Sequence, residues 1–273
     1  MPAARESSSS LKILMLHGYT QNGPLFHAKT RAMEKNLNKI FPGISLNYPT
    51  APLQLKPRDV PGYQPSTDGD PDSLEAYGWW RRSDTSDPPD YYGLDQGLAS
   101  VAKILESEGP FDGIIGFSQG AALAAMVASL LEGSLREEAF SKAQEKSKFA
   151  IDYPPAFANL EHPPLKFCAA YCGFRAPGER YTAFYEGPHI QTPMCHFIGS
   201  LDTVVEESRT QALIDAAGGA EKTQVVVHPG GHFVPNGKQY LDTIAAFIKQ
   251  TTTSNKVETG REEERVEDMD VPF

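Results

Sequence analysis

Ser118 is the residue of this sequence that is best placed to act as a nucleophile. It stands at the centre of the pentapeptide Gly116-Phe117-Ser118-Gln119-Gly120. The apolar run at 113–117 has the composition of a buried strand, and the alanine-rich run at 121–131 has that of a buried helix. The glycines let strand and helix approach closely, so the turn would present the serine hydroxyl near a helix N-terminus, where developing negative charge is favoured. Small-residue turns also serve packing alone, but this strand–turn–helix context favours a nucleophile.

A serine hydroxyl is too weak an acid to attack a carbonyl unaided, and the sequence supplies a candidate base and a candidate acid. His232 follows two glycines in a turn after a predicted strand, and we interpret it as the base that takes the Ser118 proton. We interpret Asp202, in a Gly-Ser-Leu-Asp turn, as the carboxylate that orients His232. Along the chain these residues occur in the order Ser…Asp…His, one of the orders in which such residues are found in serine hydrolases. Two alternatives stay open: His228 as the base, and Asp202 as only the N-cap of the next helix.

Acyl transfer also needs donors for the oxyanion that forms on the carbonyl oxygen. We expect the backbone N–H of Gln119, the residue after the nucleophile, to be one of them. The turn after the first predicted strand, His17-Gly18-Tyr19, would supply the second through the N–H of Tyr19. We interpret His17 as a residue that orders this turn through hydrogen bonds.

Three aromatic residues are candidates for the substrate pocket. Trp79 and Trp80 lie in a proline-rich stretch, where a pocket wall and a place in the core are both open interpretations. Phe233 follows the candidate base directly and is predicted to line the pocket. The alternating aspartates of segment 68–72 have the spacing of metal ligands, but the glycine and glutamate of a calcium loop do not follow them. We therefore interpret them as a solvated loop and predict no metal site.

Strands and helices alternate along the chain. Apolar strands are predicted at 11–16, 44–48, 113–117, 166–172, 194–198 and 223–227. Helices are predicted at about 27–41, 93–108, 121–131, 205–217 and 237–249. This alternation predicts an α/β fold with a mostly parallel central sheet and helices on both faces. Because the carboxyl ends of parallel strands meet at one edge, the turns that follow four of these strands would bring the candidate residues together.

The predicted helices and strands define one domain with tails and insertions. We expect a disordered segment at 1–10, a single domain at 11–250 and a disordered acidic tail at 251–273. Two stretches are too long for ordinary connections and read as insertions, at about 53–92 and 134–165.

Composition narrows the function classes. The chain has 273 residues, a net charge of −10 and 40% hydrophobic residues. An acidic balance argues against nucleic acid as a partner, because binding a phosphate backbone needs clustered Lys and Arg. The chain shows neither a secretory signal nor an apolar run that could span a membrane, and its three cysteines are sparse. We therefore expect no membrane association and a cytoplasmic location, with the nucleus as a further compartment.

Four segments together carry a resemblance to a known family. They are Leu16-His17-Gly18-Tyr19-Thr20-Gln21-Asn22-Gly23, Gly116-Phe117-Ser118-Gln119-Gly120, Gly199-Ser200-Leu201-Asp202-Thr203-Val204-Val205 and Gly231-His232-Phe233-Val234-Pro235. With these segments the chain resembles, over about 11–249, the FSH-type serine hydrolases of fungi, a family that includes the animal ovarian-cancer-gene-2 esterases. The resemblance implies an α/β-hydrolase fold, cleavage of carboxylic ester or thioester bonds, and no metal or organic cofactor. It assigns the nucleophile to Ser118, the acid to Asp202 and the base to His232.

Three functions remain as hypotheses. The first is a serine esterase for small-molecule esters of small or medium acyl chains. The second is an acyl-thioesterase, because some members of the family look like thioesterases that release polyketides from a carrier protein. A carrier partner would be acidic, and Arg81-Arg82 is the basic feature that hints at it. The third is a non-catalytic binding protein that keeps the pocket as a receptor surface.

Overall fold

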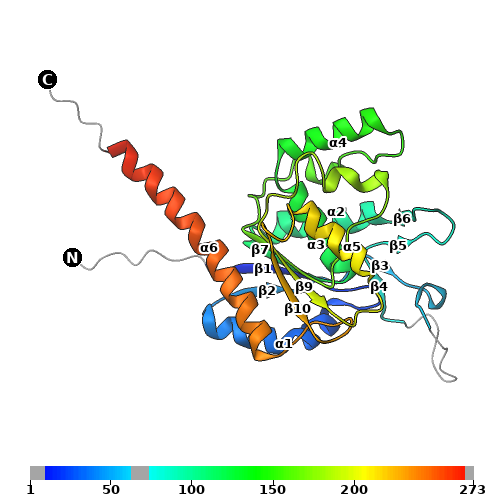
Figure 1. Ribbon diagram of the computed structural model, residues 1–273, viewed down its shortest axis with the longest axis horizontal. Helices are drawn as coiled ribbons and strands as arrows, with labels where there is room; N and C mark the ends of the chain where they lie inside the picture. Colours follow the sequence, from blue (N-terminus) through cyan, green and yellow to red (C-terminus); the bar gives the residue numbers. More distant parts are fainter. Residues whose placement is uncertain (1–9, 63–73, 268–273) are drawn as a thin grey trace.

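A six-stranded parallel sheet runs through the centre of the molecule (Figure 1), in the order β10-β9-β8-β7-β1-β2. The computed structural model describes residues 10–62 and 74–267, with side chains up to residue 253. The strands of this sheet are β1 (Lys12–Leu16), β2 (Ser45–Asn47), β7 (Gly113–Phe117), β8 (Phe167–Tyr171), β9 (Met194–Gly199) and β10 (Gln224–His228). All strands point the same way, so the loops that leave their carboxyl ends share one edge.

Helices cover both faces of the sheet. Figure 1 shows α1 (Gly23–Ile40) and α6 (Lys238–Glu267) on one face and α2 (Leu94–Glu108), α3 (Gln119–Leu130) and α5 (Glu207–Ala216) on the other. Side chains of β1 alternate between the two cores: Ile13 and Met15 pack toward α1 and α6, while Leu14 and Leu16 pack toward α2 and α3. The predicted α/β class, with a parallel sheet and helices on both faces, is confirmed.

Two helices differ from their predicted bounds. α1 begins at Gly23 rather than near His27, because the Asn22 side chain caps it by accepting a hydrogen bond from the Leu25 N–H at 2.8 Å. α6 continues to Glu267, through most of the segment for which a disordered tail is predicted. Glutamate and arginine dominate 261–267, and both residue types are good helix formers. The predicted disordered segment 1–10, apart from its last residue, and the end of the chain from 268 on lie outside the described residues.

The two predicted insertions contain secondary structure of their own. The first holds two small antiparallel sheets, β3-β4 and β5-β6, and a short helix. Their bounds are β3 (Leu53–Gln54), η1 (Pro57–Asp59), β4 (Tyr77–Gly78), β5 (Arg81–Arg82) and β6 (Tyr91–Tyr92). The aspartates of 68–72 lie outside the described residues. The second insertion holds α4 (Ser134–Lys146) and η3 (Pro155–Phe157), and η4 (Glu179–Phe184) follows β8.

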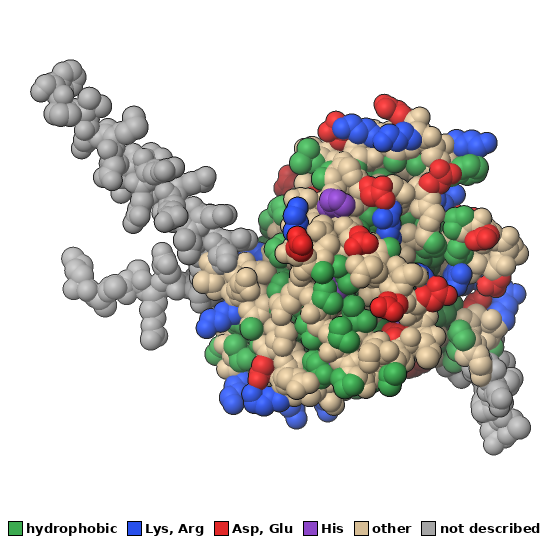
Figure 2. Space-filling model, viewed as in Figure 1, with side chains coloured by type: hydrophobic (Ala, Val, Ile, Leu, Met, Phe, Trp, Pro, Cys, Tyr) green, Lys and Arg blue, Asp and Glu red, His purple; other side chains and the backbone are tan. Residues whose placement is uncertain are grey.

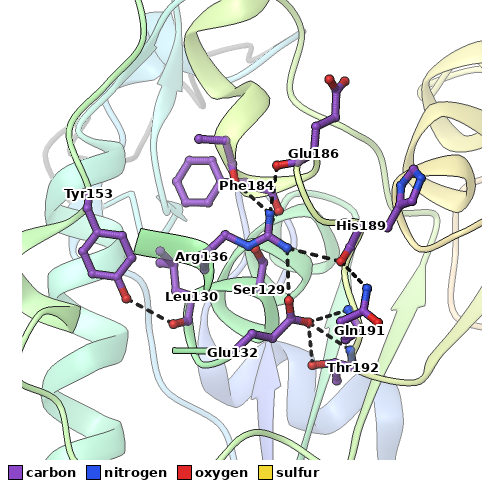
Figure 3. Close-up of polar contacts among 11 residues, drawn as sticks. Ser129, Leu130, Glu132, Arg136, Tyr153, Phe184, Glu186, His189, Gln191 and Thr192 are labelled. Carbon is purple, nitrogen blue, oxygen red and sulfur yellow. Dashed lines mark hydrogen bonds and ion pairs between the residues drawn. The ribbon is translucent and has the colours of Figure 1, made fainter. Parts of the chain in front are cut away.

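A buried ion pair holds α4 to the rest of the molecule. Arg136, in the first turn of α4, is fully buried, and its guanidinium pairs with the Glu132 carboxylate at 3.0 Å (Figure 3). The same guanidinium also donates to the carbonyls of Ala183, Glu186 and His189 at 2.9, 3.3 and 3.4 Å. The other carboxylate oxygen of Glu132 accepts from the backbone N–H groups of Gln191 and Thr192 at 2.6 and 2.9 Å. The second insertion is therefore fixed at its start to the segment around η4.

Charged side chains of both signs lie interspersed on the face that Figure 2 shows. Small groups of Lys and Arg side chains lie at the top and at the lower left of that view, although the chain as a whole carries a net charge of −10. In the described part of the chain, every helix is too short or too polar to cross a bilayer.

Two histidines are held neutral inside the fold. His17, directly after β1, and His196, in β9, are 0% and 1% exposed, and burial lowers the pKa of each to about 4. His17 accepts a hydrogen bond from the Ala51 N–H at Nε2, at 3.0 Å, which requires that nitrogen to be unprotonated. Both ring nitrogens of His196 lack a hydrogen-bond partner among the described residues. Protonation of either ring therefore opposes the native packing.

We expect the Arg136→Met substitution to destabilise the protein by about 3–5 kcal/mol, because it leaves the Glu132 carboxylate, whose side chain is only 9% exposed, without its cation. Urea unfolding followed by circular dichroism measures this loss. The matched control is Lys142→Met on the same helix, whose ion pair with Glu138 is more than half exposed at both side chains and should change stability by less than about 1 kcal/mol. Equal losses for the two variants would contradict a special role of the buried pair.

We expect the free energy of unfolding to fall as the pH drops from about 6.5 to about 4. In this range His17 and His196 become protonated in the unfolded chain, whereas both rings stay neutral in the native state. Each ring contributes roughly 2 kcal/mol to the difference between about pH 7.5 and about pH 5. His196→Leu removes one of the two titrating groups, so its stability should depend less steeply on pH. Urea unfolding at several pH values tests this, and an unchanged slope in the variant would disprove it.

Candidate active site

Ser118 occupies a strained turn between β7 and α3. Its backbone has φ of 54° and ψ of −115°, a region that non-glycine residues rarely adopt. The flanking glycines make the turn possible: a Cβ on Gly116 would lie 2.2 Å from the Gly120 carbonyl oxygen, and one on Gly120 would lie 2.2 Å from the Leu16 carbonyl oxygen. The Gly-x-Ser-x-Gly spacing thus lets strand, turn and helix pack at backbone contact, and it places Ser118 at the carboxyl edge of the sheet.

Three side chains from three loops form a continuous hydrogen-bonded chain at this edge. His232, in the loop after β10, lies with Nε2 2.8 Å from the Ser118 hydroxyl oxygen. Its Nδ1 lies 2.7 Å from a carboxylate oxygen of Asp202, in the loop after β9. The imidazole packs on the ring of Phe117, with centroids 5.0 Å apart. This arrangement can transfer the serine proton to the imidazole while the carboxylate holds the ring.

The Asp202 carboxylate is stabilised in its ionised form. Burial alone would raise its pKa, but hydrogen bonds from the Val205 N–H, from His232 and from the Val204 N–H outweigh burial and lower the pKa below its ordinary value. The two backbone bonds measure 3.0 and 2.8 Å and go to the oxygen that does not contact His232. Asp202 therefore stays charged near neutral pH and presents its second oxygen to the imidazole.

The structure excludes the alternative roles of His228 as the base and of Asp202 as an N-cap. His228 ends β10 and is 2% exposed, and its ring packs on Phe233 at a centroid distance of 5.0 Å. It is absent from the cleft that contains Ser118, so the structure brings His232 and not His228 to the nucleophile. Asp202 does not cap α5, whose N-cap is Glu206.

The expected oxyanion donors lie on two separate elements. Gln119 is the first residue of α3, and its N–H belongs to the helix turn that has no partner within the helix. Tyr19 lies in the turn after β1 and, like Ser118, lines the cleft. His17 holds this turn by donating from Nδ1 to the Gly18 carbonyl at 2.7 Å and accepting at Nε2 from Ala51. In the described part of the chain, neither N–H donates to a backbone carbonyl in a turn, loop or cap.

A cleft of about 530 Å³ opens beside Ser118 and His232. Its walls are mostly apolar and come from Tyr19, Phe26, Val60, Pro61, Phe117, Val204, Phe233 and Val234, with Thr20, Gln21 and Lys29 as the polar members. Phe233 is one of these lining residues, with 49% of its surface exposed. Val60 and Pro61 belong to the first insertion, whereas the second insertion contributes no residue to this lining.

Trp79 and Trp80 do not line the cleft, and the pocket-wall interpretation is corrected here. They are 0% and 2% exposed. The Trp79 indole N–H donates to the His17 carbonyl at 2.9 Å, and Trp80 stacks on Tyr91 with ring centroids 4.8 Å apart. Both rings therefore belong to the buried core and not to the cleft wall.

Phe26 and Phe117 line the cleft and were not singled out from the sequence. Phe26 follows the N-cap of α1 by one turn, and Phe117 is the variable position before the nucleophile. The signal for Phe117 was its place inside the Gly-x-Ser-x-Gly motif, next to the nucleophile. For Phe26, a phenylalanine on a predicted helix carries no sign that it faces a cleft.

Within the described residues, Cys172, Asp202 and His232 are grouped closely enough to hold a metal ion, with ligand atoms within 4.8 Å of one another. Burial, followed by the nearby Asp202 carboxylate, raises the pKa of the Cys172 thiol to about 12. A metal ligand must be a thiolate, and Asp202 and His232 already hydrogen-bond each other. The chemistry of this group therefore fits a hydrogen-bonded serine site better than a metal site.

Comparisons with known proteins identify the family of the chain. A family model described as serine hydrolase (FSH1) matches residues 7–244. Esterase OVCA2 of Danio rerio is 33% identical over 251 residues, 89% of this chain and 99% of that protein. Family of serine hydrolases 2 of Saccharomyces cerevisiae is 30% identical over 244 residues, 88% of this chain and 98% of that protein.

Two further matches extend the comparison. A Schizosaccharomyces pombe protein named dihydrofolate reductase is 30% identical over 260 residues, and this chain spans 50% of its length. Among solved structures, acyl-protein thioesterase 2 of Zea mays has a TM-score of 0.56 at 19% identity, over 89% of this chain and 94% of that one. This last likeness shows the fold alone. The family model and the full-length relatives show that the chain belongs to the FSH1 family of serine hydrolases.

Proposed function

We propose that the protein is a serine esterase that cleaves carboxylic esters of small or medium acyl chains through an acyl-enzyme intermediate. The observation that carries this proposal is the unbroken chain from the Asp202 carboxylate through His232 to the Ser118 hydroxyl, with contacts of 2.7 and 2.8 Å. The name of the zebrafish relative, an esterase, supports the same reaction class.

The first half-reaction forms the acyl-enzyme. Ser118 Oγ attacks the ester carbonyl carbon, and its proton passes to His232 Nε2. The carbonyl oxygen becomes an oxyanion that faces the N–H groups of Tyr19 and Gln119. When the tetrahedral intermediate collapses, His232 returns the proton to the departing alkoxide, and the alcohol leaves.

The second half-reaction repeats these steps with water. His232 takes a proton from a water molecule, the hydroxide attacks the acyl carbon, and the proton returns to Ser118 Oγ as the acid leaves. Asp202 stabilises the imidazolium in both halves, because its lowered pKa keeps the carboxylate charged while the ring is protonated.

The cleft supports an apolar acyl group. Its walls are mostly aromatic and aliphatic, and its volume of about 530 Å³ lies within the usual range for small-molecule sites. Phe26 and Phe117, both in this lining, stack with ring centroids 6.5 Å apart and form part of its apolar wall. An acyl chain that lies along this wall would remove apolar surface from water.

We favour a small-molecule ester over a thioester on a carrier protein. An acidic carrier would need free cations near the cleft, and Arg81-Arg82 was the basic feature that hinted at one. Arg81 instead pairs with the Asp59 carboxylate at 3.6 Å, and Arg58 approaches the same carboxylate at 3.9 Å. Part of this positive charge is therefore neutralised within the protein itself.

We expect Ser118→Ala to lower kcat on a p-nitrophenyl acyl ester by on the order of 10⁴ to 10⁶, because the nucleophile is lost. A fluorophosphonate probe should label the unmodified protein at one site per chain, and Ser118→Ala should abolish labelling. Ser129→Ala is the matched control, because Ser129 is a fully buried serine on α3, the helix that Ser118 precedes. Little adduct on the folded, unmodified protein would instead support a non-catalytic receptor.

Replacing both Arg81 and Arg82 by Ala should leave KM for an acyl-carrier-protein thioester within about twofold of its original value, because lost rim charges weaken only partners that dock on them. Rates on the ester and the thioester of one acyl chain, each with a small leaving group, provide the reference. A KM that rises about tenfold for the carrier-bound substrate alone would overturn the preference for small-molecule esters.

A further inference from the structure

The two expected oxyanion donors need a fixed spacing, yet they belong to elements that are not adjacent in sequence. Tyr19 follows β1, and Gln119 begins α3. Both N–H groups must reach one oxygen atom within hydrogen-bond distance as negative charge develops on it. Segment 77–80, in the first insertion, lies against both elements and bonds to each of them.

On one side, segment 77–80 is bonded to the side chain of Gln119. The Gln119 Oε1 accepts from the Trp79 N–H at 2.8 Å, and its Nε2 donates to the Trp80 carbonyl at 2.9 Å. Gln119 is 5% exposed, and both bonds are buried. The carboxamide thus accepts one hydrogen bond from the main chain of segment 77–80 and donates another to it, which is also how the main chain of a neighbouring strand pairs.

On the other side, the same segment is bonded to the turn that contains Tyr19. The Trp79 indole N–H donates to the His17 carbonyl at 2.9 Å, and the Thr20 N–H donates to the Tyr77 carbonyl at 2.9 Å. The rings of His17 and Trp79 also pack with centroids 5.1 Å apart. The turn is therefore held by main-chain and side-chain bonds on both sides of Tyr19.

We propose that the side chains of Gln119 and Trp79 are positioning residues that set the distance between the two oxyanion donors. The proposal rests on the serine esterase function above and adds to it a part of the chain that does not touch the substrate. Segment 77–80 acts as a rigid spacer: one end fixes the start of α3, and the other fixes the turn after β1.

The residue types suit this role. Glutamine offers an acceptor and a donor on one planar group, and both are used here. Glutamate has two acceptors and would confront the Trp80 carbonyl with negative charge, while asparagine is one methylene shorter. The backbone N–H of residue 119 is present whatever the side chain, so substitutions of Gln119 separate positioning from donation.

The test compares Gln119→Met and Trp79→Phe with Ser129→Ala. Methionine keeps the length of glutamine without its hydrogen bonds, and phenylalanine removes the indole donor while it keeps an aromatic ring. Ser129, fully buried on the same helix, donates to the Phe184 carbonyl at 2.6 Å and has no bond to segment 77–80, so its loss costs a buried hydrogen bond away from the donors.

We expect kcat on a p-nitrophenyl ester to fall roughly tenfold to hundredfold in Gln119→Met and in Trp79→Phe, less than the loss of a whole oxyanion donor, while KM changes less than about threefold. Affinity for a trifluoromethyl ketone of the same acyl chain, which binds as an oxyanion, should fall by a similar factor. The kcat of the double variant should lie within about threefold of the kcat of the slower single variant, because both substitutions break the same spacer. Ser129→Ala should keep kcat.

Several results would overturn the proposal. A folded Gln119→Met or Trp79→Phe protein with the original kcat would do so, as would an equal loss of kcat in Ser129→Ala. If Gln119→Met fails to fold, Trp79→Phe alone decides. Failure of the esterase function looks different: the unmodified protein and Ser118→Ala would then hydrolyse the ester at the same rate.

Discussion

Backbone contact between β7, α3 and the end of β1 is the constraint on which the site depends. Gly120 lies so close to Leu16 that a single Cβ would come within 2.2 Å of the Leu16 carbonyl oxygen. The same contact brings the nucleophile turn beside the turn that carries Tyr19. Ser118 can hold a left-handed φ of 54° because the packing of the surrounding strands and of the buried α3 fixes the backbone of the turn in this conformation.

The parallel sheet then supplies the remaining partners. Ser118 and His232 are separated by 114 positions in the chain, yet their side chains meet at 2.8 Å because β7 and β10 end at the same edge. Asp202 comes from β9, which is paired directly with β10 from Gln224 to His228. Each residue thus leaves a rigid strand through a short loop, and rigid supports allow such chemistry to keep its geometry.

Much of this could be predicted from the sequence, because strand periodicity, glycine-rich turns and chain order are local signals. They place Ser118, Asp202 and His232 at one edge, where the structure finds them in contact. The positions of Trp79 and Trp80 could not be predicted, because a tryptophan in a proline-rich segment has the same sequence signal in a wall as in the core. The position of this segment depends on hydrogen bonds to the Gln119 carboxamide and the His17 carbonyl, which are distant in the chain.

The two predicted insertions differ in how they contact the α/β core. The second is fixed by Arg136 of α4, which pairs with Glu132 just before that helix, and it contributes no residue to the lining of the cleft. The first contributes Val60 and Pro61 to the cleft and, through segment 77–80, contacts both elements that carry the oxyanion donors. A loop that only covered substrate could vary in position without harm to the chemistry. This one is bonded to the nucleophile helix itself, so its placement and the geometry of the oxyanion site are parts of one packing arrangement.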